Sequence, residues 1–243
     1  MNQRKESRLD PHDPTTEQES LDDEVRKDPR GPMPPKLANL RFKLGQKAKQ
    51  QPDFRFYALY GHLLRVDVLE TAIASVAASK GCETPGVDGV TMNHIVNAEG
   101  GPAAFLAVIR AELHAKKYRP QPVKRIYIPK ANGQQRPLGI PAICDRVVQT
   151  AVVLLLEPIF DADFLDCSYG FRPKRSAHGA IEEVQANLRA GYTEVYDADL
   201  QDYFDSIPHD KLMKGLETRL ADGSMLRLIR LFLQAPEIGR AHV

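Results

Sequence analysis

The residues of this chain that most clearly suggest chemistry lie between positions 196 and 207. There Asp197 and Asp199 end a short β-rich approach, Thr193 to Tyr196, and two aromatic rings follow them. Mg²⁺ prefers oxygen ligands and is usually held by one or two carboxylates together with substrate phosphates. Asp199 therefore predicts half of a metal site beside a nucleotide. We find no second carboxylate strand in the 243 residues.

The same run has a plainer interpretation. A strand can leave a core into a solvated acidic turn, because Asp and Asn favour turns. Asp205 or Ser206 would then help to start the helix that Pro208 opens. On these residues alone the two interpretations are about equally good, so the choice depends on the rest of the chain.

Charge is distributed unevenly along the chain. The net charge is only +1, yet residues 1–30 hold nine acids and six bases, while residues 36–50 hold bases and no acid. A second basic stretch covers residues 110–146. Basic stretches of this density are candidates for contacts with nucleic-acid phosphates, because each neutralised phosphate releases counterions. The alternative for either stretch alone is a solvated face.

Composition predicts an ordinary globular protein of one large or two modest domains, with 42% hydrophobic and 27% charged residues. There is no apolar run of membrane-helix length and no apolar signal region at the start, so we expect a cytoplasmic protein without membrane contact. Cys82, Cys144 and Cys167 lack metal-site spacing and are expected to be free thiols.

Several elements are predicted along the chain. Residues 1–35 have the composition of a disordered acidic and Pro-rich tail. Residues 36–49 have apolar positions at helical spacing and predict a basic amphipathic helix. The other predicted helices lie at 56–78 (one or two), 105–113, 147–156 with Asp145 as its cap, 177–188 with Ser176 as its cap, 212–220 and 225–233.

A hairpin is predicted in the middle of the chain. The strand at 123–128 is followed by Asn132-Gly133, which is a strong hairpin signal between extended segments. The returning strand covers 135–140, and Pro137 favours an edge position for it. Helices around a small set of strands predict the α+β class.

Three segments together resemble one family: 127–141 (Tyr-Ile-Pro-Lys through Gln-Arg-Pro-Leu-Gly-Ile-Pro), 169–178 (Tyr-Gly-Phe-Arg-Pro-Lys-Arg-Ser-Ala-His) and 197–212. They are similar to the fingers and first palm blocks of bacterial group II intron-encoded reverse transcriptase/maturases. The basic helix, Phe56 to Tyr60 and Gly86 to Thr91 extend the resemblance to the family's N-terminal extension. It covers about residues 36–236.

The resemblance implies a right-hand polymerase fold: a helical basic N-terminal extension at 36–80, fingers at 81–190 and the first part of the palm at 191–236. It implies an RNA-directed DNA polymerase with intron RNA as template, a DNA primer or target, deoxynucleoside triphosphates and Mg²⁺. An RNA-binding splicing cofactor, or a reverse transcriptase outside introns, remains an alternative. The family also continues beyond the blocks found here, so we expect this chain alone to be inactive.

Individual site residues follow from the same resemblance. Asp199 is expected to be the catalytic metal ligand, with the Leu200 carbonyl as a further oxygen. Phe204 would lie under the sugar of the incoming nucleotide, with a core position as its alternative. Lys130 and Arg136 would contact the triphosphate, since ammonium and guanidinium groups both bind phosphate well. The residues expected to contact nucleic acid are Lys36, Arg41, Lys43, Lys47, Arg172, Lys174 and Arg175.

The last seven residues, 237–243, can be written in codons that read as sequencing-adapter DNA. This predicts that they are a non-native read-through at the end of a truncated gene.

Overall fold

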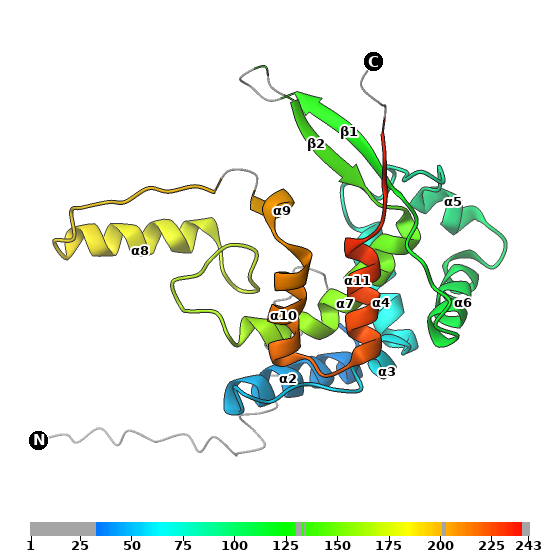
Figure 1. Ribbon diagram of the computed structural model, residues 1–243, viewed down its shortest axis with the longest axis horizontal. Coiled ribbons are helices and arrows are strands. Elements are labelled where there is room, and N and C mark those ends of the chain that lie inside the picture. Colours follow the sequence, from blue (N-terminus) through cyan, green and yellow to red (C-terminus); the bar gives the residue numbers. More distant parts are fainter. Residues whose placement is uncertain (1–32, 130–132, 134, 201–202, 240–243) are drawn as a thin grey trace, which may run out of the picture.

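The fold is described by a computed structural model that covers residues 33–129, 133, 135–200 and 203–239, with only the backbone of Asp205 (Figure 1). Helices and strands are mixed, as the α+β prediction required. The elements in chain order are α2 (Pro35–Gln50), α3 (Leu59–Leu63), α4 (Val66–Ala77), α5 (Met92–Asn97), α6 (Gly101–His114), β1 (Val123–Pro129), β2 (Gln135–Ile140), α7 (Ile143–Asp161), α8 (Ala177–Arg189), α9 (Tyr203–Ser206), α10 (His209–Arg219), α11 (Gly223–Leu233) and β3 (Glu237–Ile238).

The core is built around α7, which is apolar on nearly every side and packs against α2, α3 and α4. Leu154, Leu155 and Ile159 are fully buried there. A Cβ on Gly45 of α2 would lie 3.3 Å from the Pro158 carbonyl oxygen of α7, so glycine permits the close approach of the two helices. This core crosses the expected domain boundary at residue 80, because helices from both sides of it share one apolar interior.

The long loop between α4 and α5 is fastened to the start of α7. The Arg146 guanidinium donates to the carbonyl oxygens of Gly81 at 2.7 Å, Thr84 at 2.6 Å and Pro141 at 2.9 Å. Gly86 in the same loop lies directly against the backbone of Ala142, where an added Cβ would be 2.7 Å from both N and Cα. The loop at 81–91 is therefore held against the start of α7.

The predicted hairpin is confirmed. Strands β1 and β2 pair antiparallel, with Ile128 opposite Arg136 and Lys124 opposite Ile140. The sheet order is β2-β1-β3, so the strand that contains Pro137 lies at an edge, as its missing N–H requires. β3 pairs parallel with β1 at Val123 and Lys124. The prediction that 237–243 is non-native stays untested, and residues 240–243 lie outside the described part.

The C-terminal helices α10 and α11 close the lower side of the core. Phe56 and Leu220 form an isolated parallel bridge, in which the Phe56 N–H donates to the Arg219 carbonyl at 2.7 Å. The buried Arg219 side chain also donates to the Ala48 carbonyl at 3.0 Å and to the Pro52 carbonyl. The end of α10 is thereby bound to the end of α2, and these two side-chain hydrogen bonds join residues 167 and 171 positions apart.

Two predicted details are wrong. The expected tail ends earlier than residue 35, because Met33 is buried and Pro35 opens α2 in the first helical position, where proline is tolerated. Asp145 does not cap its helix, which starts at Ile143 after Ala142. Its carboxylate is buried in the first turn instead. The cap predicted at Ser176 is confirmed, since its hydroxyl accepts from Gly179 N at 3.1 Å.

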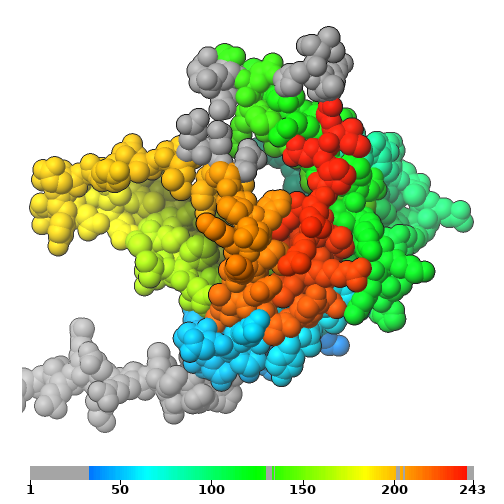
Figure 2. Space-filling view, viewed as in Figure 1, coloured from blue at the N-terminus to red at the C-terminus, as the bar shows by residue number. Residues whose placement is uncertain are grey.

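Helix α8 stands apart from the core, as Figures 1 and 2 show at the left of the molecule. The predicted apolar face at Ile181, Val184 and Leu188 is present, but none of the α8 residues is buried. No helix in the described part of the chain is long and apolar enough to cross a membrane.

Candidate functional site

The hairpin β1–β2 projects from the molecule and carries Arg136 on its exposed edge strand (Figure 1). Gly133 at its tip has φ +81°, a conformation that suits glycine in a tight turn. Arg136 lies opposite Ile128, close to this tip. Lys130 and Asn132 lie outside the described residues, so the expected pairing of Lys130 with Arg136 around one phosphate stays a prediction.

Asp199 lies in an exposed segment between α8 and α9. Its Oδ1 accepts a hydrogen bond from Leu200 N at 2.9 Å, and the Leu200 side chain is 68% exposed. The expected strand at 193–200 is absent, which corrects that prediction. A strand needs a neighbour to pair its N–H and C=O groups, and no described segment pairs with this one.

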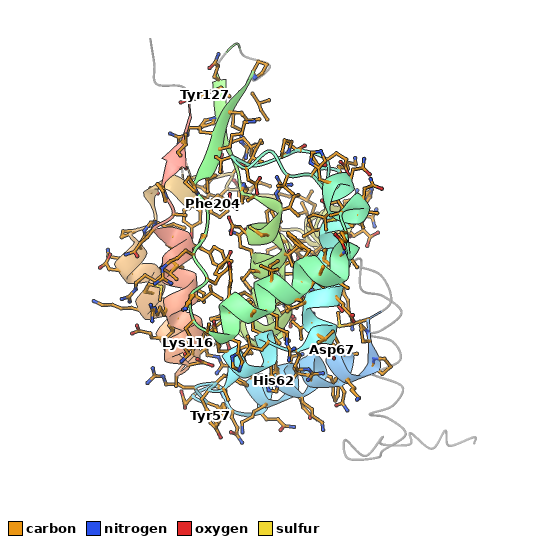
Figure 3. The ribbon with its side chains drawn as sticks, turned by 90° about the vertical axis from the view of Figure 1, so that its right-hand side faces the viewer. Tyr57, His62, Asp67, Lys116, Tyr127 and Phe204 are labelled. Atoms are coloured by element: carbon orange, nitrogen blue, oxygen red, sulfur yellow. The ribbon has the colours of Figure 1, made fainter. Side chains whose placement is uncertain are left out.

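Phe204 follows in the short helix α9, with its ring 80% exposed and packed edge-on against Tyr203 at 5.4 Å between centroids. The alternative of a core phenylalanine is therefore wrong for this chain. Figure 3 shows Phe204 near the base of the hairpin, with Tyr127 further out along it. In Figure 2 an opening separates the hairpin, α9 and the residues after α11, so the hairpin and α9 face a common hollow.

The donor atoms near Asp199 fit Mg²⁺ in type but not in number. A carboxylate and a carbonyl oxygen are hard ligands of the kind that Mg²⁺ takes. However, no group of three or more His, Cys, Asp or Glu side chains that could hold a metal occurs among the described residues. Asp199 thus belongs to no cluster of three such side chains in the part of the chain that the structure describes. We derive no catalytic step through a metal from this arrangement.

Helix α2 has an exposed basic face, as predicted, but one of the predicted residues is buried. Lys36, Lys43 and Lys47 are exposed, and the Lys47 ammonium lies 3.7 Å from the Phe54 ring centroid. Arg41 is only 4% exposed, and its guanidinium donates to the Leu154 carbonyl at 2.5 Å and to Glu157 at 2.7 Å. The expectation that Arg41 contacts RNA is therefore wrong, because the side chain joins α2 to α7 inside the protein.

The predicted basic residues in the loop before α8 also include both buried and exposed side chains. The Arg172 side chain is 8% exposed and donates to Asp161 at 2.7 Å and to the Leu165 and Ser168 carbonyls, so it stabilises the loop rather than facing a template. Arg175 lies 3.1 Å from Asp166. Lys174 is exposed and has φ +60°, a left-handed conformation that is uncommon for lysine.

A buried polar cluster connects α7 with the approach to β1. The Asp145 carboxylate accepts from the Tyr118 hydroxyl and from Gln121 N at 2.9 Å. Burial raises the pKa of Asp145, while its hydrogen bonds act in the opposite direction. Burial and the adjacent Asp145 raise the pKa of the Cys144 thiol to about 12. Sequence patterns offered no signal for this cluster, since its members lie up to 27 positions apart.

The comparisons with known proteins identify the family. A family model described as "Reverse transcriptase (RNA-dependent DNA polymerase)" matches residues 128–242, which include Arg136, Asp199 and Phe204. The "Group II intron-encoded protein LtrA" of Lactococcus lactis subsp. cremoris is 34% identical over 204 residues, covering 84% of this chain and 33% of that protein. The chain belongs to the group II intron reverse transcriptases.

Two further comparisons show how much of each chain is matched. "Protein YkfC" of Escherichia coli (strain K12) is 39% identical over 206 residues, which is 83% of this chain and 53% of that protein. The chain thus spans about half or less of the length of these two relatives. A solved chain described as "Partial Cas6-RT-Cas1--Cas2 complex" has 21% identity and a TM-score of 0.40, covering 72% of this chain and 27% of that chain.

Proposed function

We propose that these residues serve RNA-directed DNA synthesis in a group II intron-encoded protein. The observation that supports this most is the reverse transcriptase family match over 128–242, which contains strand β2 with Arg136, Asp199 and Phe204 in one continuous stretch. Intron RNA would be the template, and a DNA primer and deoxynucleoside triphosphates the other substrates.

Each site residue has a proposed role. Asp199, with the Leu200 carbonyl, would be one part of a Mg²⁺ site, and the metal when bound would stabilise the attacking and leaving oxygens of phosphoryl transfer. The exposed Phe204 ring would pack under the sugar of the incoming nucleotide. Lys130 and Arg136 on the hairpin would hold its triphosphate. The exposed Lys36, Lys43, Lys47 and Lys174, with the partly exposed Arg175, would contact nucleic acid.

A role in intron splicing is compatible with the same protein. Exposed lysines on one face of α2 provide an RNA-binding surface that does not involve Asp199. The relatives of this chain also include "Nuclear intron maturase 1, mitochondrial" of Arabidopsis thaliana, which is 35% identical over 94 residues. We therefore propose that splicing depends on RNA binding by the α2 region, while synthesis depends on the Asp199 region.

The decisive experiment compares Asp199→Asn with Glu194→Gln in the complete gene product. Glu194 is an exposed carboxylate in the same segment and serves as the matched control. Asp199→Asn should lower primer extension on an RNA template by at least about 100-fold, since it removes a metal ligand that acts on the transition state. Glu194→Gln should extend at the normal rate.

RNA affinity should be the same for both variants. Wild-type extension by Asp199→Asn would disprove the assignment of this residue. Arg136→Ala or Lys130→Ala should lower kcat/KM for the nucleotide by roughly 10- to 150-fold, the value of one charge-assisted phosphate contact.

A further inference from the structure

A pocket of about 240 Å³ lies between α3, the segment after α6, and the start of α11. Its polar and aromatic lining comes from Tyr60, Lys116, Tyr118, Arg119, Ser224 and Arg227. None of the residues assigned above to nucleotide or metal binding lines it. Figure 3 shows Lys116 at the end of the molecule away from the hairpin that carries Tyr127, so the pocket is separate from the Asp199 region.

Three positive charges surround this pocket without a partner of opposite charge. Among the described residues no carboxylate forms an ion pair with Lys116, Arg119 or Arg227. Arg119 uses Nη1 to donate to its neighbour's carbonyl at 2.9 Å, which leaves most of its guanidinium donors available. Cations that line one pocket repel one another, and a bound anion would remove this repulsion.

The carboxylate at the start of α11 does not neutralise this group. Asp222 is buried and its oxygens accept backbone N–H groups from Tyr60 at 2.8 Å, Ser224 at 3.0 Å and Met225 at 3.1 Å. Its charge is thus used to cap α11 and to hold α3. Because these bonds occupy both oxygens, the cations at the pocket remain free for a ligand.

The hydroxyls of the two pocket tyrosines bind within the protein, and only the Tyr60 ring is partly exposed, since Tyr118 is buried. The Tyr60 hydroxyl donates to the Leu113 carbonyl at 2.7 Å, and the Tyr118 hydroxyl donates to Asp145. Burial raises the pKa of Tyr60 and the positive charge of Arg227 acts against this, so the guanidinium lies within electrostatic reach of the phenol. Aromatic walls beside cations suit a nucleotide, whose base stacks on a ring and whose phosphate binds the charges.

The backbone at Lys116 adds an independent observation. After α6, Lys116 N donates to the Leu113 carbonyl at 3.0 Å and Lys117 N to the Glu112 carbonyl at 2.9 Å, which is the Schellman pattern of a helix end. The left-handed position in this pattern is usually glycine, yet here Lys116 occupies it with φ +55°. A lysine is strained in this backbone conformation, whereas a glycine is not. The lysine side chain places a positive charge at the pocket.

We propose that this pocket binds one phosphodiester of an RNA strand, with the adjoining nucleotide against the partly exposed ring of Tyr60. The proposal rests on the proposed RNA-binding function and adds a second contact point to it. Helix α2, with its exposed lysines, lies at the same end of the molecule (Figures 1 and 3). An RNA strand bound along α2 can therefore continue to the pocket, and the pocket volume is right for a single nucleotide unit rather than a larger ligand.

The test measures binding of a fluorescent single-stranded RNA to the full chain by anisotropy over a series of salt concentrations. Arg227→Gln and Arg119→Gln should each weaken binding about ten-fold or more, and should lower the slope of log affinity against log salt by about 0.7. Lys214→Gln, an exposed cation on α10 away from the pocket lining, is the matched control and should change neither.

Lys116→Gly separates binding from folding. Glycine suits the left-handed backbone, so this variant should melt at a higher temperature than the parent and yet bind RNA more weakly. Lys116→Arg keeps the charge and should bind normally. If Lys116→Gly binds RNA as tightly as the parent, the lysine serves no ligand and the proposal fails.

Two further outcomes would also overturn the proposal. Inorganic phosphate at constant ionic strength should weaken RNA binding by the parent chain but not by Arg227→Gln; equal effects on both would place the RNA elsewhere. If the pocket variants lose binding to a polyaspartate peptide but keep RNA binding, the pocket takes an acidic peptide instead. Absence of any RNA binding by the parent chain would refute the proposed RNA-binding function itself, whereas normal binding by all pocket variants refutes only this site.

Discussion

The arginine side chains of this protein fall into two groups, which differ in burial and in what they bind. Arg41, Arg172 and Arg219 donate to main-chain carbonyls inside the protein, where each also meets a carboxylate. The planar guanidinium suits this role, because its several fixed donors can satisfy carbonyls at helix ends at once. Arg119 and Arg227 remain exposed, and their charges are free for a ligand.

Arg41 and Lys43 on the same helix provide a direct comparison. Arg41→Ala should lower the free energy of unfolding by about 3 kcal/mol, because it removes the guanidinium donors that bind Glu157 and the buried Leu154 carbonyl. Lys43→Ala should change it by less than about 0.5 kcal/mol but should weaken RNA binding. Urea unfolding and anisotropy measure the two effects. An Arg41→Ala variant that is as stable as the parent would contradict the structural role.

The three thiols should differ in reactivity with pH. The raised pKa of Cys144, about 12, leaves roughly 10³-fold less thiolate at pH 8 than an ordinary exposed cysteine has. Cys167 is exposed and should react first with iodoacetamide, whereas Cys144 should react slowly, at a rate that rises about ten-fold per pH unit up to its pKa. Peptide mapping by mass spectrometry identifies the modified thiol. Equal rates at pH 8 would contradict the burial of Cys144.

At the scale of elements, the loop 81–91 depends on a close backbone approach. Gly86→Ala places a methyl group 2.7 Å from the Ala142 backbone, which cannot move without shifting α7. The substitution should therefore cost about 1–3 kcal/mol of unfolding free energy. Gly170→Ala is the control, since nothing lies within 4 Å of its added methyl group, and it should be within about 0.5 kcal/mol of the parent. Equal stability of the two variants would show that the loop is not held against α7.

At the scale of the whole molecule, the chain should bind RNA but not polymerise DNA. The described residues bring one carboxylate, Asp199, to the proposed metal site, whereas phosphoryl transfer by two metals needs further oxygen ligands. We expect no primer extension by the purified 243-residue chain with Mg²⁺ or Mn²⁺. Its RNA affinity should still fall as salt rises, because exposed lysines contact phosphates. Extension that is lost in Asp199→Ala would contradict this account.

The sequence by itself determined the local elements and the family. Helical spacing at 36–49, the hairpin signal at Asn132-Gly133 and the Ser176 cap depend on neighbours within a few positions, so each could be predicted without the fold. The blocks at 127–141, 169–178 and 197–212 carried the resemblance that the family match confirmed.

Only the tertiary structure decided which basic residues are free and which extended segments are strands. Arg41 and Lys43 carry the same charge, but only Arg41 lies at the helical spacing of the buried face of α2. Its partners there, the Leu154 carbonyl and Glu157, are distant in sequence and follow only from the fold. The stretch 193–200 has strand-like residues but no partner among the described segments. Lys116, Arg119 and Arg227 line one pocket because α6, the segment that follows it and α11 pack against the same core. Burial and pairing depend on contacts between residues far apart in the chain, and these contacts exist only once the chain has folded.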